Sequence, residues 1–314
     1  MRIVRLISAL LVAGLGLGAA PAWSFTVKTV GSGFFNPTGV AVDRSGNVFV
    51  GDLNNHAVKE ILAADGYTTV NTLNGTINTP FGVAVDGSDN VFVADSGGSA
   101  IREILAAGSY TTIDTLGSGI RTPNGVAVDG SGNVFVADTG HNAVKEILAA
   151  GGYTIVNTLG SGFSSPSDVA VDGNGNVFVA DSSHNAVKEI LAASGYTTVI
   201  TLGSGFNFPF GVAVDGQGNV FVADAGNNAV KEIVAAGGYT TVNTLAVGFR
   251  FPEGIALDGN GNIFVADTLH NAIKEIVGAA PLAPVPALGT WALLLCGMLL
   301  GGTGFAAARR RGTA

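Results

Sequence analysis

Three histidines share one position of a repeated segment and are the residues best suited to metal chemistry. His141, His184 and His270 each lie three residues after an aspartate, and three imidazoles can bind zinc. They occur in different copies of the segment, and another copy has Asn227 at the same position. They are either weak metal-ligand candidates or polar loop residues that hydrogen-bond the backbone. The sequence predicts no cofactor.

Two sets of aspartates recur with the same spacing and offer carboxylates for chemistry. The first set opens an Asp-x-x-Gly-Asn turn, which resembles the start of a calcium loop but lacks its later glycine and distant glutamate. We expect these side chains to cap their own turns. The second set ends a Phe-Val-Ala-Asp segment and either ties the next loop to the strand end or forms a ring around a metal. The two sets are Asp43, Asp86, Asp129, Asp172, Asp215, Asp258 and Asp52, Asp95, Asp138, Asp181, Asp224, Asp267.

A basic residue followed by glutamate, Lys145-Glu146 in the third copy, also recurs in every copy. Neighbouring residues on a strand point to opposite faces of the sheet. A lysine of one sheet is therefore expected to meet a glutamate of the next sheet.

The positions that differ between copies are more informative about binding, because they break the symmetry of the repeat. They surround a repeated proline and include Asp168, which replaces a glycine of the other copies. Exposed aromatic, basic and acidic side chains suit a binding surface, although drift in exposed loops remains the alternative. The candidate ligand-binding residues are Thr38, Phe81, Asn124, Arg121, Ser167, Asp168, Phe210, Arg250 and Glu253.

These residues must be positioned by a repeat of 43 residues that occurs in six copies without an insertion. The third copy contains four strand-like segments, at residues 125–128, 133–137, 143–148 and 153–159, separated by Gly-rich turns. Four antiparallel strands per repeat of this length predict an all-β, six-bladed β-propeller. The sixth copy lacks its fourth strand. The segment Phe25–Val30 aligns with that strand, so it is expected to close the ring.

The two ends of the chain differ from the repeats in composition. Residues 1–24 combine early arginines, an apolar run and Ala22-Trp23-Ser24, which predicts a signal peptide, with an N-terminal membrane anchor as the alternative. The propeller is predicted at 25–277 and a Pro/Ala linker at 278–287. Residues 288–308 predict a transmembrane segment and 309–314 a basic cytoplasmic tail. The single cysteine, Cys296, lies in that segment, so the exported part forms no disulfide.

The exported part is strongly acidic. Residues 25–285 contain 10 of the 15 Lys and Arg but all 23 Asp and Glu, a formal charge of −13. This charge argues against binding nucleic acid through phosphate contacts.

The repeats resemble NHL repeats, because every copy keeps the Val-Asp, Gly-Asn and Phe-Val-Ala-Asp skeleton apart from Asp89, Gly51 and Leu257. The copies consistently have Ala where many NHL repeats have Arg, so a role of that arginine does not transfer. The tail resembles an IPTL-CTERM sorting signal through Pro286, Leu288, Trp291, Arg309, Arg310 and Arg311.

The tail resemblance implies processing by an exosortase-like protease. The protein would be an inner-membrane intermediate of a Gram-negative bacterium, held through the C-terminal helix, and then pass to the cell surface. A permanent single-span anchor is the alternative.

Three functions are compatible with the sequence. The first is an exported scaffold that binds a surface protein or glycan through the variable loops. The second is a propeller enzyme of lyase or lactonase type with a metal site in the central channel, which would need an assembled acid, base or metal group. RNA binding, known for some NHL proteins, fits poorly with export and the acidic charge.

Overall fold

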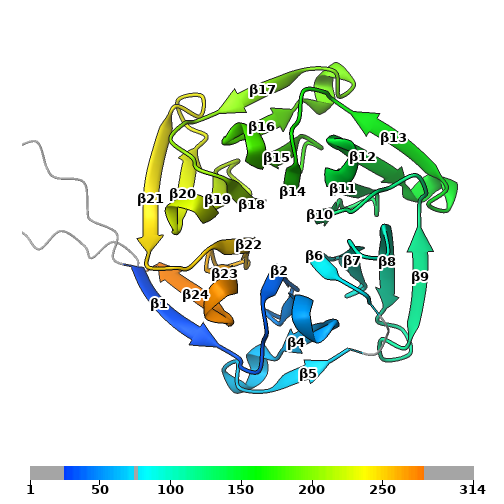
Figure 1. Ribbon diagram of the computed structural model, residues 1–314, viewed down its shortest axis with the longest axis vertical. Helices are drawn as coiled ribbons and strands as arrows, with labels where there is room; N and C mark the ends of the chain where they lie inside the picture. Colours follow the sequence, from blue (N-terminus) through cyan, green and yellow to red (C-terminus); the bar gives the residue numbers. More distant parts are fainter. Residues whose placement is uncertain (1–24, 74–76, 279–314) are drawn as a thin grey trace, which may run out of the picture. The chain divides into compact units, whose positions relative to one another are not determined.

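The computed structural model describes residues 25–73 and 77–278. These residues form six four-stranded antiparallel sheets arranged as blades around a centre (Figure 1). The predicted signal peptide, transmembrane segment and basic tail lie outside the described residues, as does the predicted linker except for Gly278, which is the last residue of a propeller strand. The described range contains no helix that is long and apolar enough to cross a membrane.

Within each blade the strands follow one another from the centre to the perimeter (Figure 1). The innermost strands are β2 (Pro37–Val42), β6 (Pro80–Val85), β10 (Gly125–Val128), β14 (Pro166–Val171), β18 (Pro209–Val214) and β22 (Pro252–Leu257). The second strands are β3 (Val48–Asp52), β7 (Val91–Asp95), β11 (Val134–Asp138), β15 (Val177–Asp181), β19 (Val220–Asp224) and β23 (Ile263–Asp267). The third strands are β4 (Ala57–Ile61), β8 (Ala100–Leu105), β12 (Ala143–Leu148), β16 (Ala186–Ile190), β20 (Ala229–Val234) and β24 (Ala272–Gly278).

The outermost strands are β5 (Val70–Thr72), β9 (Thr112–Leu116), β13 (Ile155–Leu159), β17 (Val199–Leu202), β21 (Thr241–Val247) and, in the last blade, β1 (Phe25–Val30). Short 3-10 turns follow the second strands at η1 (Leu53–Asn55), η3 (Thr139–His141), η5 (Ser182–His184), η7 (Ala225–Asn227) and η8 (Thr268–His270). Others follow the third strands at η2 (Ala63–Asp65), η4 (Ala149–Gly151) and η6 (Ala192–Ser194).

The N-terminal strand closes the ring as predicted. β1 pairs antiparallel with β24 from Phe25↔Gly278 to Val30↔Ile273 (Figure 1). The backbone N–H of Gly31, just after β1, donates to the carbonyl of Tyr67 at 2.9 Å, and Gly117 after β9 makes the same bond to Tyr153. The contact between the last and first blades therefore has the same hydrogen bond as the contact between other neighbouring blades.

Apolar side chains fill the space between neighbouring blades. Phe264 of blade six is fully buried and meets the ring of Tyr67 from blade one edge-on, with centroids 5.6 Å apart. Phe49 meets Tyr110 of the next blade in the same way at 6.2 Å. Edge-to-face contacts of this kind add to the stabilisation from buried area. The tyrosines lie in the loops before the outermost strands rather than on those strands, so the predicted segment 153–159 begins too early.

Candidate functional site

The aspartates that end the second strands are buried and hold the neighbouring loop, as one of the two interpretations predicted. Oδ1 of Asp138 accepts the backbone N–H of Arg121 at 2.8 Å, and its Oδ2 pairs with Lys145 Nζ at 2.7 Å. Asp181 makes the equivalent contacts with Ser164 and Lys188, at 2.6 and 2.5 Å. The carboxylates are therefore satisfied inside their own blades and do not converge on a central metal.

The expected pairing of lysine with glutamate between blades is wrong. Lys145 binds Asp138 of its own blade, and Glu146 Oε2 accepts a hydrogen bond from Asn157 of the outermost strand at 3.2 Å. The register places the lysine beside the end of the second strand, where it contacts the buried carboxylate of Asp138 and donates to the carbonyl of Gly119.

The repeated histidines also serve these aspartates. Nδ1 of His141, His184 and His270 lies 2.8, 2.8 and 2.9 Å from Oδ2 of Asp138, Asp181 and Asp267. Each pair stays within one blade, so the structure does not bring the three histidines together. No group of three His, Cys, Asp or Glu that could hold a metal ion occurs in residues 25–73 and 77–278.

The Asp-x-x-Gly-Asn turns are capped by their own aspartates, as expected. Asp172 Oδ1 accepts the N–H groups of Asn174 and Asn176 at 2.9 and 2.8 Å, and Oδ2 accepts the Asn176 amide at 3.0 Å. Oδ1 of Asn176 then accepts the N–H of Ala192 in the next loop of that face at 3.1 Å. These oxygens stabilise the turns, which favours the capping role over a calcium loop.

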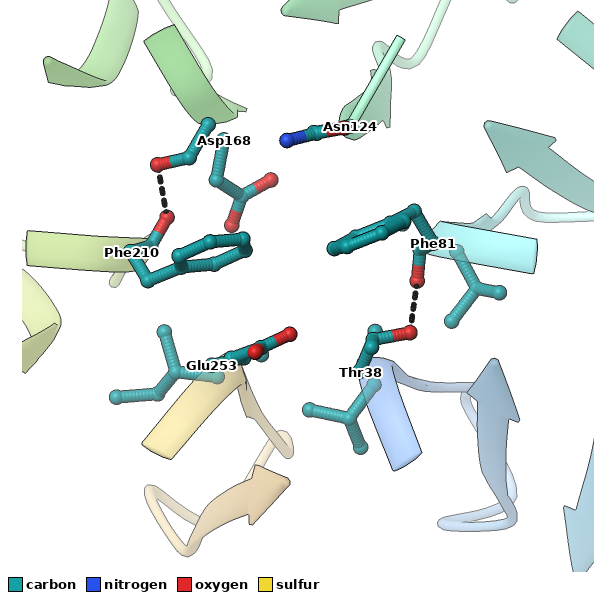
Figure 2. A pocket seen from close by; sticks show the side chains of 13 residues that line it. Thr38, Phe81, Asn124, Asp168, Phe210 and Glu253 are labelled. Atoms are coloured by element: carbon teal, nitrogen blue, oxygen red, sulfur yellow. Dashed lines mark hydrogen bonds between the residues drawn. The ribbon is translucent and has the colours of Figure 1, made fainter. Parts of the chain in front are cut away.

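The innermost strands surround a central channel. The variable loops lie on the face opposite the capped turns, and a narrow pocket opens there at the mouth of the channel (Figure 2). The pocket has a volume of about 20 Å³ when it is measured as the space open to the centre of a water molecule. By the same measure, one water needs at least ~10–15 Å³. The pocket therefore has room for one small group, such as a water or a single ion. Seven of the predicted binding residues line it: Thr38, Phe81, Asn124, Ser167, Asp168, Phe210 and Glu253. Arg121 and Arg250 lie in exposed loops outside this lining.

The lining residues are less exposed than the sequence suggested. Thr38 is buried and its hydroxyl donates to the carbonyl of Phe81 in the next blade at 2.9 Å. Ser167 is likewise buried and donates to the carbonyl of Phe210 at 2.6 Å. These hydroxyls already join neighbouring blades, which leaves the aromatic, amide and acidic side chains as the groups that face the pocket.

Two acids with raised pKa values face this pocket. Burial raises the pKa of Asp168 to about 7, against the lowering effect of hydrogen bonds from the N–H groups of Val212 and Val169. Burial raises the pKa of Glu253 to about 8. Glu253 is 7% exposed, and its Oε2 has no hydrogen-bond partner among the described residues. Acids with perturbed pKa values are enriched at functional sites.

Four phenylalanines contact one another at the pocket and form what we call the phenylalanine cluster: Phe81, Phe208, Phe210 and Phe251. The rings of Phe81 and Phe210 stack with centroids 6.0 Å apart and planes 23° apart. Phe208 and Phe251 are 6.0 Å apart, and each also contacts Phe210. The predicted site omitted Phe208 and Phe251. Their position before the repeated proline varies between copies, and this signal identifies them.

The pKa of Glu253 leads to a prediction about stability. Its pKa rises from 4.5 to about 8 on folding, so its contribution is most favourable below about pH 4.5 and is lost as pH rises through 8. We expect Glu253→Gln to stabilise the propeller at pH 9 by on the order of 2–5 kcal/mol and to have little effect at pH 5. Urea unfolding at both pH values measures this, and an equal shift at both would contradict it.

The comparisons with known proteins agree with this fold. The NHL repeat model matches residues 34–61, 121–147, 163–190, 206–233 and 249–275, and the IPTL-CTERM motif model matches residues 283–311. The second blade is the copy without a match. It has Asp89 in its first turn, and its β7–β8 connection lacks the 3-10 turn that follows the second strand of every other blade. No curated protein sequence matches this chain.

Solved structures with this architecture include both enzymes and binding proteins. Virginiamycin B lyase from Staphylococcus aureus has a TM-score of 0.58 at 12% identity and covers 82% of this chain and 99% of its own. A gluconolactonase from Xanthomonas campestris has a TM-score of 0.68 at 14% identity and covers 81% and 89%. An auxiliary nutrient binding protein from Bacteroides thetaiotaomicron has a TM-score of 0.67 at 12% identity and covers 82% and 78%.

At these identities the likeness shows the fold alone. The family models, the repeat skeleton and the six blades agree with one another. The chain is therefore an NHL-repeat protein whose repeats form a six-bladed β-propeller, and it carries an IPTL-CTERM motif at residues 283–311.

Proposed function

We propose that this protein is exported to the cell surface of a Gram-negative bacterium and binds a protein or glycan there through its variable loop face. The observation that carries this proposal is the phenylalanine cluster. Phe208 is 36% exposed and packs against Phe210 and Phe251 rather than into a blade core. Clustered, partly exposed aromatic side chains are typical hot spots of binding surfaces.

The backbone of the cluster supports a binding role. Phe208 and Phe251 have φ values of +50° and +55°, a left-handed conformation that is unfavourable for bulky side chains. Other copies place Asn36 or Ser165 at the same position, and asparagine tolerates this backbone far better. Strain of this kind concentrates at binding and catalytic sites. The two phenylalanines therefore cost stability at this position and are kept for what they contact.

The ends of the described propeller lie where display at a surface would need them. Phe25 and Gly278, the ends of the described propeller, pair with each other at the face that carries the capped turns. The variable loops lie at the opposite face, so attachment through the tail would leave the phenylalanine cluster free. The IPTL-CTERM motif supports processing by an exosortase-like protease, with membrane attachment before cleavage. Nucleic acid is not expected as a partner.

The binding proposal is tested by capture from the surface fraction of the source bacterium. We expect Phe208→Asn with Phe251→Asn to weaken capture at least about tenfold and to leave the melting temperature unchanged or slightly higher. The matched control is Ile155→Asn, which removes an exposed apolar side chain of the outermost strand β13, outside the variable loops. Protease or glycosidase treatment of the fraction distinguishes a protein from a glycan. Equal capture by the double variant and the wild type would contradict the proposal.

The enzyme alternative is favoured by the two acids in the channel mouth, whose raised pKa values suit proton transfer near neutral pH. A lyase or lactonase of this kind would hold its metal at Asp168, Glu253 and Asn124, which line the same pocket. The test is metal analysis of the purified protein, followed by repeated capture after chelation. A stoichiometric transition metal whose removal abolishes capture would favour the enzyme.

A further inference from the structure

We propose that the channel mouth binds a primary ammonium group on an alkyl stem, with Asp168, Glu253 and Asn124 as its acceptors. The inference deepens the proposed binding function and rests on it, because it names the chemistry that the variable face recognises. The group is either the side chain of a lysine on a protein partner or a free amine.

The first observation is an acceptor that lacks a donor. Glu253 Oε2 is buried without a hydrogen-bond partner, and its carboxylate points into the pocket together with that of Asp168 (Figure 2). No ion pair joins either acid to a basic side chain within residues 25–73 and 77–278, although the six aspartates that end the second strands all have hydrogen-bond partners. A buried carboxylate left in this way is costly unless it is protonated or meets a cation.

The second observation is the cost of placing Asp168 where it is. The other copies have glycine here, because neighbouring innermost strands approach closely at this point. A Cβ on Gly82 would lie 2.5 Å from the carbonyl oxygen of Asn124, and one on Gly211 would lie 2.1 Å from that of Glu253. In blade four, Asp168 places a side chain at this crowded position, and its carboxylate points to the centre of the channel. A residue that breaks the repeat at such a position marks a functional site.

The number and kind of groups favour an ammonium ion over a metal ion. An alkylammonium head has three N–H donors. Apart from the Thr38 and Ser167 hydroxyls, which already donate to backbone carbonyls, the side chains of the pocket that carry oxygen acceptors are Asp168, Glu253 and Asn124. Calcium takes 6–8 oxygen ligands. The pocket has room for a group about the size of a water molecule, which fits an ammonium head.

The aromatic side chains complete the match to an organic cation. The stacked rings of Phe81 and Phe210 line the pocket beside the acids (Figure 2). Aromatic rings attract ammonium groups through their electron-rich faces and cover the methylene stem. Hydrated metal ions gain little from such walls. The combination of acids and phenylalanines around one opening is therefore suited to a lysine-like group.

Binding of a cation has a consequence for protons. Asp168 and Glu253 are the titratable side chains among the residues that line this pocket, and burial raises the pKa of each to about 7 and about 8. An ammonium ion beside them favours their ionised forms. Binding near pH 7 should therefore release protons to the buffer, which a purely apolar ligand would not cause.

The experiment uses the purified full-length chain and n-butylamine as probe, with n-butanol as the uncharged control, in calorimetry at pH 7 in buffers of different ionisation enthalpy. We expect butylamine to bind at least about tenfold more tightly than butanol and to release protons. A lysine-containing peptide and its acetyl-lysine form separate the sources. Tighter binding of the unmodified peptide than of butylamine assigns a protein lysine, and the reverse assigns a free amine.

Two variants keep the test independent of folding. Asp168→Gly restores the glycine of the other blades, and Glu253→Thr imports the residue of blade one, so both should fold. Each is expected to weaken butylamine binding at least about tenfold, whereas Arg44→Ala, in an exposed capped turn of the opposite face, leaves it unchanged. Equal binding of butylamine and butanol overturns the inference, as does calcium binding that displaces the amine. If amine binding is absent but capture still depends on Phe208 and Phe251, only this inference falls.

Discussion

A chain without residues Phe25–Val30 is expected to melt roughly 10 °C or more below the intact chain. Removing β1 deletes Val30, which is 3% exposed and packs in one cluster with Phe264 and Ile273. The deletion therefore uncovers these neighbours and opens the edge of β24. We expect a loss on the order of 4 kcal/mol, and each kcal/mol corresponds to ~2–4 °C for a domain of this size. Thermal unfolding followed by circular dichroism measures it.

The control for closure is removal of residues 279–314, which should leave the melting temperature of the propeller unchanged. A matched pair of point variants keeps the strand in place. Val30→Asp puts a charge into the buried side of β1, whereas Val27→Asp changes a side chain that is 44% exposed. Only Val30→Asp should destabilise strongly. If the shortened chain melts with the intact one, the ring does not depend on β1.

Asp138→Ala is expected to destabilise the propeller by about 3–5 kcal/mol, because it removes the shared acceptor of a buried network. Asp138 is 0% exposed and binds Lys145, His141 and the N–H of Arg121. Without the carboxylate, Lys145, whose side chain is only 13% exposed, loses its counter-ion and the loop before Pro123 loses its anchor. Urea unfolding at pH 7 gives the change in free energy.

The control within this network is His141→Asn. Blade five has Asn227 at the same position, where its amide donates to Asp224 Oδ2 at 2.7 Å. His141→Asn should therefore change stability by less than about 1 kcal/mol. A similar loss for His141→Asn and Asp138→Ala would show that the aspartate is not the centre of the network.

The sequence by itself determined the architecture. A constant period of 43 residues with turn residues at fixed offsets specifies four strands per unit, because strand and turn preferences act over a few neighbouring residues. The unmatched strand at Phe25–Val30 and the shortened sixth copy specify the closure, since an open edge strand must pair. The turn-capping role of Asp172 was also predictable, because its partners lie within four residues.

Only the tertiary structure decided which side chains meet. The sequence alone did not show whether Lys145 meets a glutamate of the next blade or the end of a strand in its own blade. The register pairs Lys145 with Val136, which places it diagonally opposite Asp138. Phe81 and Phe210 come from different blades and stack across the channel. The crowding around Asp168 depends on the spacing of innermost strands in the closed ring. These contacts join segments that are far apart in the chain, so residue types and the repeat period do not predict which side chains are close in space. The blades themselves are predictable because they depend on local sequence pattern.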